Sequence, residues 1–171
     1  MITLVEPSEK YLASYMEACR EHRANGVQGY PFYDAETQDI FEKYENFRAE
    51  RNLPPGWVGA HYYWLVDTDK TEFIGEISIR HRLTESLKRY GGHIGYGVRF
   101  SRWNQGYGTR MLRLGLEKAK ELGISRVLIT CDDDNYASAK VMEHNGLTLQ
   151  DKVTNTIDGR TFITRRYTKT L

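Results

Sequence analysis

Two glycines spaced one residue apart, Gly106 and Gly108, stand in the run Gln105-Gly106-Tyr107-Gly108-Thr109. The run lies between an expected strand and an expected helix. The start of a helix offers unpaired backbone N–H groups and the positive end of the helix dipole, so it attracts anions. Glycines let a bulky phosphate come close to the backbone. An isolated pair of glycines is also explained by a tight turn that binds nothing, so its surroundings decide its meaning.

Three anion-binding motifs compete for this turn. A P-loop requires G-x-x-x-x-G-K-[ST], and the sequence has no such run. A dinucleotide-binding fingerprint requires a third glycine where Met111 stands, although Asp132 does follow the next expected strand. That fingerprint usually opens its domain, whereas about half of this chain precedes the turn. A nucleotide-binding oxidoreductase therefore remains an alternative function.

The third candidate is a family resemblance carried by two blocks. The first is similar to the acetyl-CoA signature of the GNAT superfamily of N-acetyltransferases, and it consists of Ile94-Gly95-Tyr96-Gly97-Val98 and Gln105-Gly106-Tyr107-Gly108-Thr109. The second resembles the helix beside the CoA pantetheine arm, and it consists of Asn135-Tyr136-Ala137-Ser138 and Glu143-His144-Asn145-Gly146-Leu147. A wider pattern looks like a poorly characterised bacterial subgroup: Arg80-His81, Gly91-Gly92-His93 and Arg165-Arg166-Tyr167. The resemblance implies transfer of an acetyl group from acetyl-CoA to a primary amine in a ternary complex, without a metal.

The resemblance also implies a set of cofactor-binding residues. These are expected on a strand, on the glycine turn and on a later helix: Tyr96, Val98, Arg99, Phe100, Arg102, Gln105, Gly106, Tyr107, Gly108, Thr109, Asn135 and Ser138. Helix capping is the alternative role for Asn135. Trp103 stands where the family usually has Gln or Arg, so phosphate binding is expected to depend on backbone N–H groups and on Arg102. Met142 stands where the family often has a tyrosine that protonates the departing thiolate, which leaves Tyr136 as a candidate donor.

The predicted catalytic residues are His93, Glu76 and Tyr136. A lysine-like amine has a pKa near 10.4, so supplying its neutral form at pH 7 costs about 4–5 kcal/mol and a general base is useful. His93 lies five residues before Val98, where some family members have a glutamate, and a histidine pKa near 6.5 suits a base. A backbone N–H near Val98 is expected to stabilise the oxyanion.

Structural alternatives exist for each candidate base. His93 could pack against the glycines that precede it, and Glu76 could pair with Arg80. His81 is a third candidate base. The remaining histidines and one cysteine are interpreted as ordinary surface, helix or core residues: His22, His61, His144 and Cys131.

These residues require an α/β fold, expected to be a GNAT-like mixed, mostly antiparallel sheet with splayed central strands and flanking helices. Alternating patterns predict strands over 2–5, 62–66, 73–80, 93–98, 126–131, 148–157 and 161–168. Helical spacing predicts helices over 11–22, 35–51, 109–122 and 135–143. The strands on either side of the third helix are expected to be parallel. Gly95 and Gly97 indicate a bulge or a close backbone approach, and 83–92 is expected to be a polar loop.

Composition narrows the class of protein. The 171 residues are expected to form one acetyl-CoA-dependent N-acyltransferase domain over 1–171. The chain has 24 basic and 23 acidic residues, which argues against nucleic acid as a partner. It has no apolar run near the roughly 20 residues of a membrane span, and no leader, so we expect a cytoplasmic protein with reduced Cys19 and Cys131.

The expected partner is a small-molecule or peptide amine, and a homodimer is left open. The acidic and aromatic segment 30–44 is expected to shape the acceptor side and to favour a cationic amine. The departures at Trp103 and Met142 also fit a catalytically weak CoA-binding module, which is the second alternative function.

Overall fold

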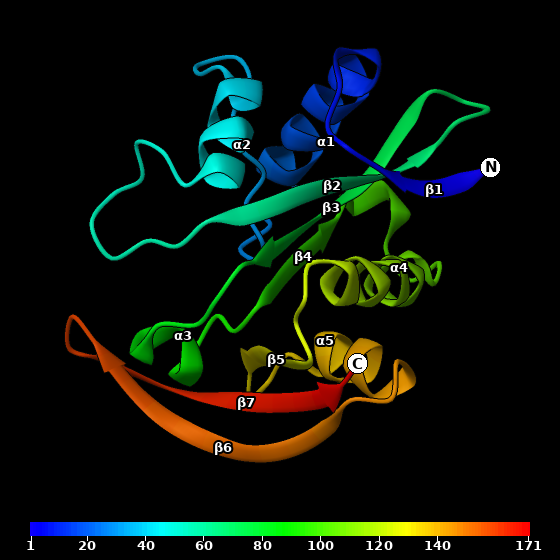
Figure 1. Ribbon diagram of the computed structural model, residues 1–171. Helices are drawn as coiled ribbons and strands as arrows, with labels where there is room; N and C mark the ends of the chain where they lie inside the picture. The colour runs from blue at the N-terminus through cyan, green and yellow to red at the C-terminus, as the bar shows by residue number, and fades with distance from the viewer.

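Two sheets meet near the middle of the molecule in the computed structural model, which describes residues 1–171 (Figure 1). The first sheet has the order β1-β2-β3-β4, formed by β1 (Ile2–Val5), β2 (Ala60–Asp67), β3 (Glu72–Arg80) and β4 (Ile94–Val98). The second has the order β5-β7-β6, formed by β5 (Arg126–Asp132), β6 (Thr148–Ile157) and β7 (Arg160–Thr170). Every strand pair within the two sheets is antiparallel.

The two sheets separate between β4 and β5. One isolated antiparallel bridge, Gly92 to Ile129, joins them, and no ladder continues from it. The predicted splayed, mostly antiparallel arrangement is therefore confirmed. The strands around the third helix, which were expected to be parallel, form no ladder with each other, because the splay leaves β4 and β5 in different sheets. The gap between them is where a ligand arm can pair with strand edges.

Helices cover both faces of the first sheet (Figure 1). On one face lie α1 (Leu12–Ala24), which follows a 3-10 turn over Glu9–Tyr11, and α2 (Ile40–Ala49). On the other face lies α4 (Tyr107–Glu121), which separates the first sheet from α5 (Tyr136–His144) and the second sheet. A second 3-10 turn, Phe100–Arg102, links β4 to α4. None of these helices has the length and apolar character needed to cross a membrane.

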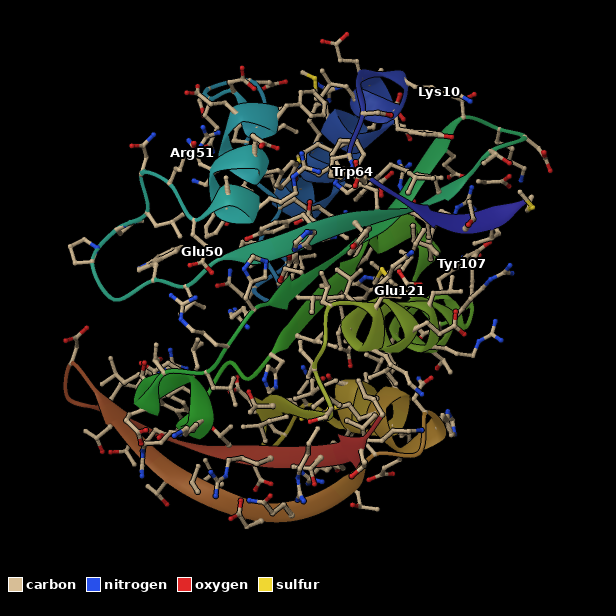
Figure 2. The ribbon with its side chains drawn as sticks, viewed as in Figure 1. Lys10, Glu50, Arg51, Trp64, Tyr107 and Glu121 are labelled. Atoms are coloured by element: carbon tan, nitrogen blue, oxygen red, sulfur yellow. The ribbon has the colours of Figure 1, made fainter.

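The alternation along β2 and β3 divides the core in two. On one face Trp64 and Phe73 are fully buried and pack with the aromatic side chains of α1 and α2. On the other face Ile77 packs with the apolar stripe of α4. Gly115 brings α4 close to the sheet, because a Cβ there would lie 2.3 Å from Ile77 Cδ1. Figure 2 shows these side chains filling the layers around the sheet, with Trp64 among them.

Local capping explains where the elements differ from prediction. The second helix is shorter than the predicted 35–51, because the Asp39 carboxylate accepts hydrogen bonds from the N–H groups of Phe41 and Glu42 and starts the helix there. The loop 83–92 contains the short helix α3 (Glu85–Arg89), capped by the Thr84 hydroxyl. The hairpin turn over 158–159 is confirmed, with positive φ at both residues.

Candidate active site

The glycine turn before α4 presents an unpaired row of backbone donors. Gly106 is the N-cap of α4 with φ +80°, and no side chain caps this helix. The first hydrogen bond of the helix runs from Arg110 N–H to Gly106 C=O, so the N–H groups from Gly106 to Thr109 have no protein partner. A Cβ on Gly106 would meet no atom within 4 Å, so the space before these donors is open. The arrangement suits a phosphate.

Two contacts hold this turn against the neighbouring helix. A Cβ on Gly108 would lie 3.4 Å from Val141 Cγ2, so α4 begins in contact with α5. The Asn145 amide nitrogen donates to Thr109 C=O at 3.1 Å and to Val141 C=O at 2.8 Å. Asn145 therefore ties the start of α4 to the end of α5. Gln105 turns the other way and donates to Ser101 C=O.

The outer edge of β4 carries free backbone groups that face the gap between the sheets. Arg99 N–H donates to Ile74 C=O, and hydrogen bonding alternates along an antiparallel ladder. Tyr96 and Val98, which pair across from Ile77 and Gly75, therefore turn their N–H and C=O groups away from β3. Except for the Val98 C=O, these groups have no protein partner, and this edge continues from the unpaired donors of the glycine turn. Together they form an extended site that fits a long ligand with a phosphate at one end.

The Val98 carbonyl already has two side-chain donors. His22 Nε2 lies 3.1 Å from this oxygen and Trp103 Nε1 lies 2.8 Å from it. His22, expected to be an ordinary helix residue, thus reaches the strand edge from α1, and burial lowers its pKa. Trp103 is 43% exposed and packs against Phe100, whose ring centroid is 4.9 Å away.

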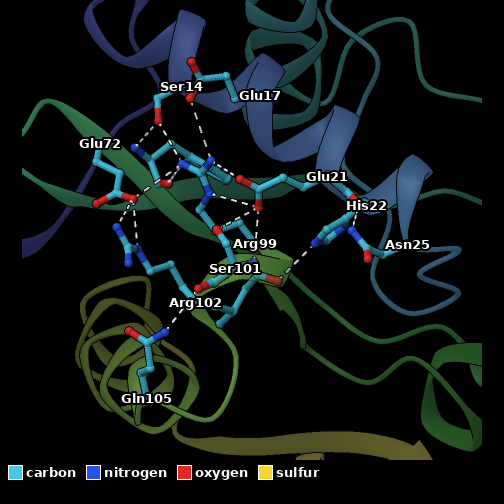
Figure 3. Close-up of polar contacts among 12 residues, drawn as sticks. Ser14, Glu17, Glu21, His22, Asn25, Glu72, Arg99, Ser101, Arg102 and Gln105 are labelled. Carbon is cyan, nitrogen blue, oxygen red and sulfur yellow. Dashed lines mark hydrogen bonds and ion pairs between the residues drawn. The ribbon is translucent and has the colours of Figure 1, made fainter.

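Arg99 is directed away from the gap (Figure 3). Its guanidinium is buried and bonds to Glu21, to the Ser14 hydroxyl at 3.1 Å and to Phe73 C=O at 3.1 Å. Only its backbone is therefore available to a ligand at β4. Its pairing fixes α1 against the end of β4.

Arg102 is likewise engaged with a carboxylate. Its Nε and Nη2 atoms lie 2.9 and 2.6 Å from Glu72 Oε1. The guanidinium stays partly exposed, and a phosphate on the glycine turn would compete with Glu72 for it. Backbone N–H groups are therefore the main phosphate donors at this turn.

Glu76 is completely buried under the helical layer of α1 and α2. Its carboxylate accepts hydrogen bonds from Tyr30 Oη at 2.9 Å, from Trp64 Nε1 at 2.9 Å and from Tyr44 Oη. The expected partnership with Arg80 was wrong, since no cation pairs with this carboxylate. Burial raises the pKa of Glu76 to about 7, although the three hydrogen bonds act to lower it. A carboxyl group that titrates near neutral pH can act as a base.

Tyr30 connects this buried carboxyl to the strand edge. Its ring lies over Gly95 and Gly97, where added Cβ atoms would come within 2.9 and 3.0 Å of it. These two glycines were expected to mark a bulge or a close backbone approach; the β3–β4 ladder has no bulge, and the group that lies close is the Tyr30 side chain. The phenol therefore spans from β4 to Glu76.

His93 has a structural role at the junction of the sheets. Its N–H donates to Leu128 C=O at 2.7 Å, and its Nδ1 accepts from Leu128 N–H at 3.0 Å. The neutral ring therefore carries its proton on Nε2 and has no lone pair left for an amine. Burial also lowers the pKa of His93. Both ring nitrogens of His81 make hydrogen bonds, Nε2 with His61 and Nδ1 with Glu50.

The α5 residues lie on the second sheet's side of the gap. Asn135 Oδ1 accepts from Ser138 N–H, as expected for a helix cap, and the Ser138 hydroxyl lies 2.8 Å from Tyr96 Oη. Ser138 and Tyr96 thus meet across the gap between β4 and α5. Tyr136 is 63% exposed, with its ring beside Arg165, and Met142 is fully buried. No group of three metal-ligating side chains gathers anywhere in the chain.

Two cavities flank Tyr30. One of about 510 Å³ lies against α1 and includes Cys19, His22 and Asp34. The other, of about 460 Å³, lies between α2, α3 and the β2–β3 strands and includes Ser78 and Arg80. Tyr30 and Pro31 line both. Sequence reasoning included Tyr30 in the 30–44 segment expected to shape the acceptor side, but it singled out neither Tyr30 nor His22 as a functional residue.

Comparisons with known proteins agree with this geometry. A family model described as an acetyltransferase (GNAT) domain matches residues 2–148. The fold is similar to RimL, a ribosomal L7/L12 alpha-N-protein acetyltransferase solved with coenzyme A, at a TM-score of 0.72 and 20% identity over 99% of this chain and 94% of that one. It is also similar to the microcin C7 self-immunity acetyltransferase MccE solved with acetyl-CoA and AMP. The TM-score is 0.68, and the identity is 19% over 99% of this chain and 92% of that one.

A third similar structure is the ribosomal-protein-S5-alanine acetyltransferase from Vibrio fischeri, at a TM-score of 0.68 and 18% identity over 99% of this chain and 91% of that one. No curated protein sequence matches the chain. The family match covers both the glycine turn and the α5 block, which are the two parts of the predicted resemblance. The chain belongs to the GNAT family of acetyltransferases, whose acetyl donor is acetyl-CoA.

Proposed function

We propose that this enzyme transfers an acetyl group from acetyl-CoA to a small primary amine, with the CoA phosphates on the glycine turn and the pantetheine arm along β4. The observation that carries the proposal is the unpaired N–H row from Gly106 to Thr109, which continues into the free edge of Tyr96 and Val98. A phosphate of CoA can accept hydrogen bonds from the N–H row of the turn, and the amide groups of the pantetheine arm can pair with the edge of β4. Acetyl-CoA supplies the activated acyl carbon, and the outward-facing N–H group of Val98 binds its oxygen.

The base in this proposal is Glu76, reached through Tyr30. Glu76 has no exposed surface and cannot touch an amine, whereas the Tyr30 hydroxyl bonds to it and the Tyr30 ring lines both cavities. The amine gives its proton to the Tyr30 oxygen while Tyr30 gives its own proton to Glu76. Burial raises the pKa of Tyr30 well above its usual range, so the phenol stays protonated between turnovers.

The departing thiolate needs little help from the protein. Met142 has no proton to give, and Tyr136 is exposed at the start of α5. A thiol has a pKa near 8.5, so its thiolate is a fair leaving group and can take a proton from water or from Tyr136. Asn135 and Ser138 are proposed to contact the CoA arm from the α5 side, with Ser138 exchanging its bond to Tyr96 for one to the ligand.

The proposal is tested by measuring free-thiol release from acetyl-CoA in the presence of a panel of primary amines. The expected result is thiol release that requires both an amine and acetyl-CoA, with the acetylated amine detected by mass spectrometry. Binding of acetyl-CoA without acetylation of any amine would instead support a CoA-binding module that has lost catalysis. Thermal stabilisation by NAD but not by acetyl-CoA would support the nucleotide-binding alternative.

A further inference from the structure

The cavity of about 460 Å³ between α2, α3 and the sheet has an unusual combination of linings. Six of its 15 lining residues are aromatic, namely Tyr30, Tyr33, Phe47, Trp57, Tyr62 and Tyr90. One lining residue, Arg80, is charged, and no lining residue is acidic. The volume lies in the usual range for small-molecule sites. An aromatic cavity with a single cation fits a ligand with an apolar body and a negative group.

Arg80 lacks the carboxylate partner that its neighbours have. Its Nη1 atom donates to Gly91 C=O at 3.1 Å and to Gly92 C=O at 3.0 Å, which fixes the side chain without neutralising it. No acidic oxygen lies within 4 Å of it, whereas Arg82 pairs with Glu50 and Arg102 pairs with Glu72. The half-buried guanidinium therefore keeps Nε and Nη2 available for an anion.

The acidic residues of the 30–44 segment do not supply that partner. Glu36 pairs with Arg20 and Arg23, and Asp34 lies 4.0 Å from Arg23, on the far side of Pro31 from Arg80. In this cavity the 30–44 segment therefore contributes no carboxylate that would favour a cationic amine. A second cation beside Arg80 would meet like charge and no compensating carboxylate.

The position of Arg80 along β3 sets the spacing within the ligand. Arg80 is two residues from Ser78 and four from Glu76 on one face of the strand, which corresponds to about 7 and about 13 Å. Tyr30 covers β4 at the level of Glu76 and Ser78, so the reacting amine lies at that end of the cavity. An anion bound at Arg80 would then be separated from the amine by about the length of two or three residues of an extended chain.

We propose that the acceptor is a small primary amine with an aromatic or apolar body and an anionic group, and that Arg80 binds this anionic group. The inference rests on the proposed function, since it names the acceptor class of the same site. The amine reaches Tyr30, the apolar body lies among the aromatic rings, and the anionic group ends at the guanidinium.

The experiment compares matched amines that differ in one carboxylate, using phenylalanine dipeptide and tripeptide as free acids and as C-terminal amides, with spermidine as a cationic amine. For wild type we expect kcat/KM to be roughly 10- to 100-fold higher for the acids than for the amides, because a hydrogen bond between charged groups contributes a difference of this size. Arg80→Gln should abolish this preference, and Arg80→Lys should keep part of it. Lys88→Gln, which removes an exposed charge from α3 outside the cavity lining, should keep all of it.

The ratio of acid to amide is the deciding readout. Because Arg80 also holds two loop carbonyls, a purely structural role would lower both rates together and leave the ratio unchanged in Arg80→Gln. Equal use of acids and amides by wild type, an unchanged ratio in Arg80→Gln, or a preference for spermidine would each overturn the inference. Each of these results leaves acetyl transfer intact, whereas failure of the proposed function appears as no acetylation of any amine.

Discussion

At the scale of single residues, the assignment of the base changes once the side chains are placed. The sequence identifies Glu76 and His93 as titratable groups near the expected acyl site, but it does not show which lone pairs are free. Burial raises the pKa of Glu76 to about 7 against the lowering effect of three neutral hydrogen-bond donors. The hydrogen bond from Leu128 N–H removes His93 from the candidates. Trp64 lies 12 residues from Glu76, and the other partners lie 32 to 46 residues from the groups they contact, beyond the reach of local patterns.

Replacing Glu76 with Gln should lower kcat by about 10²-fold or more, because the amine loses its proton acceptor. In wild type, kcat/KM should rise with pH through one ionisation near 7, the value to which burial raises the pKa of Glu76. This limb should disappear in Glu76→Gln. Tyr30→Phe should lower kcat similarly, whereas Tyr63→Phe, on the opposite face of β2, should not. A Tyr30→Phe enzyme with full activity would rule out the proton relay.

The same carboxyl should make stability depend on pH. In the folded protein the pKa of Glu76 is about 7, against an ordinary value of 4.5. The contribution of protonated Glu76 to the free energy of unfolding is therefore complete below pH 4.5 and is lost as the pH rises through about 7. Tyr15, Tyr30, Tyr44, Tyr62 and Cys19 face it and stay neutral over this range, since burial raises the pKa of each. The Tm of wild type should therefore fall relative to Glu76→Gln between pH 4.5 and 7.5. Parallel Tm curves would show that Glu76 is ionised throughout.

His93→Ala should reduce stability more than catalysis. The substitution leaves the N–H of Leu128 without its acceptor at the junction of the sheets, which costs about 1–3 kcal/mol. Denaturant unfolding measures this loss, and kinetics of the surviving fold should keep the wild-type pH profile. If His93→Ala lost the rise of kcat/KM with pH while Glu76→Gln kept it, His93 would be the general base.

At the scale of elements, long periodic segments were predicted well and short connections were not. The apolar stripe of α4 and its stop at Gly123 follow from spacing and from a glycine with φ +85°. The short α3 and the delayed start of α2 depend on capping hydroxyl and carboxyl groups of Thr84 and Asp39. A single polar residue can cap a helix or lie in a loop, so the sequence alone did not decide the start of α2 or the presence of α3.

The connection from β4 to α4 should depend on Arg99. Arg99→Met removes a buried guanidinium from the partly buried carboxylates of Glu21 and Glu72, although Glu72 keeps Arg102, and should lower the free energy of unfolding by about 3 kcal/mol. Arg110→Met on α4, which removes an exposed hydrogen bond to Ile2 C=O of β1, should cost about 1 kcal/mol. Urea unfolding compares the two. Equal losses would mean that the network seen in Figure 3 contributes nothing beyond a surface contact.

At the scale of the whole molecule, the splay between two sheets is what creates the site. The order of elements and the two family blocks predicted it, because an edge with free N–H and C=O groups must lie next to the glycine turn. The acceptor side was less predictable. Its cavity is assembled from the α1–α2 loop, the loop after α2, and α3, which carry no shared pattern in the sequence. The acidic and aromatic segment 30–44 was expected to shape this side, but only the folded chain brings Arg80 into the cavity without an acidic partner.

The most direct test of the central claim is calorimetric titration of acetyl-CoA into wild type, Gly106→Val and Gly123→Val. Both glycines bound α4, both have φ near +80°, and a Cβ on either meets no atom within 4 Å, so the two substitutions impose the same backbone strain. Only Gly106 lies among the unpaired N–H donors. The account predicts that wild type and Gly123→Val bind acetyl-CoA with similar affinity, whereas folded Gly106→Val binds at least about 10-fold more weakly because the phosphates lose several charge-assisted hydrogen bonds. Equal affinities for all three proteins would contradict the assignment of the CoA site to this turn.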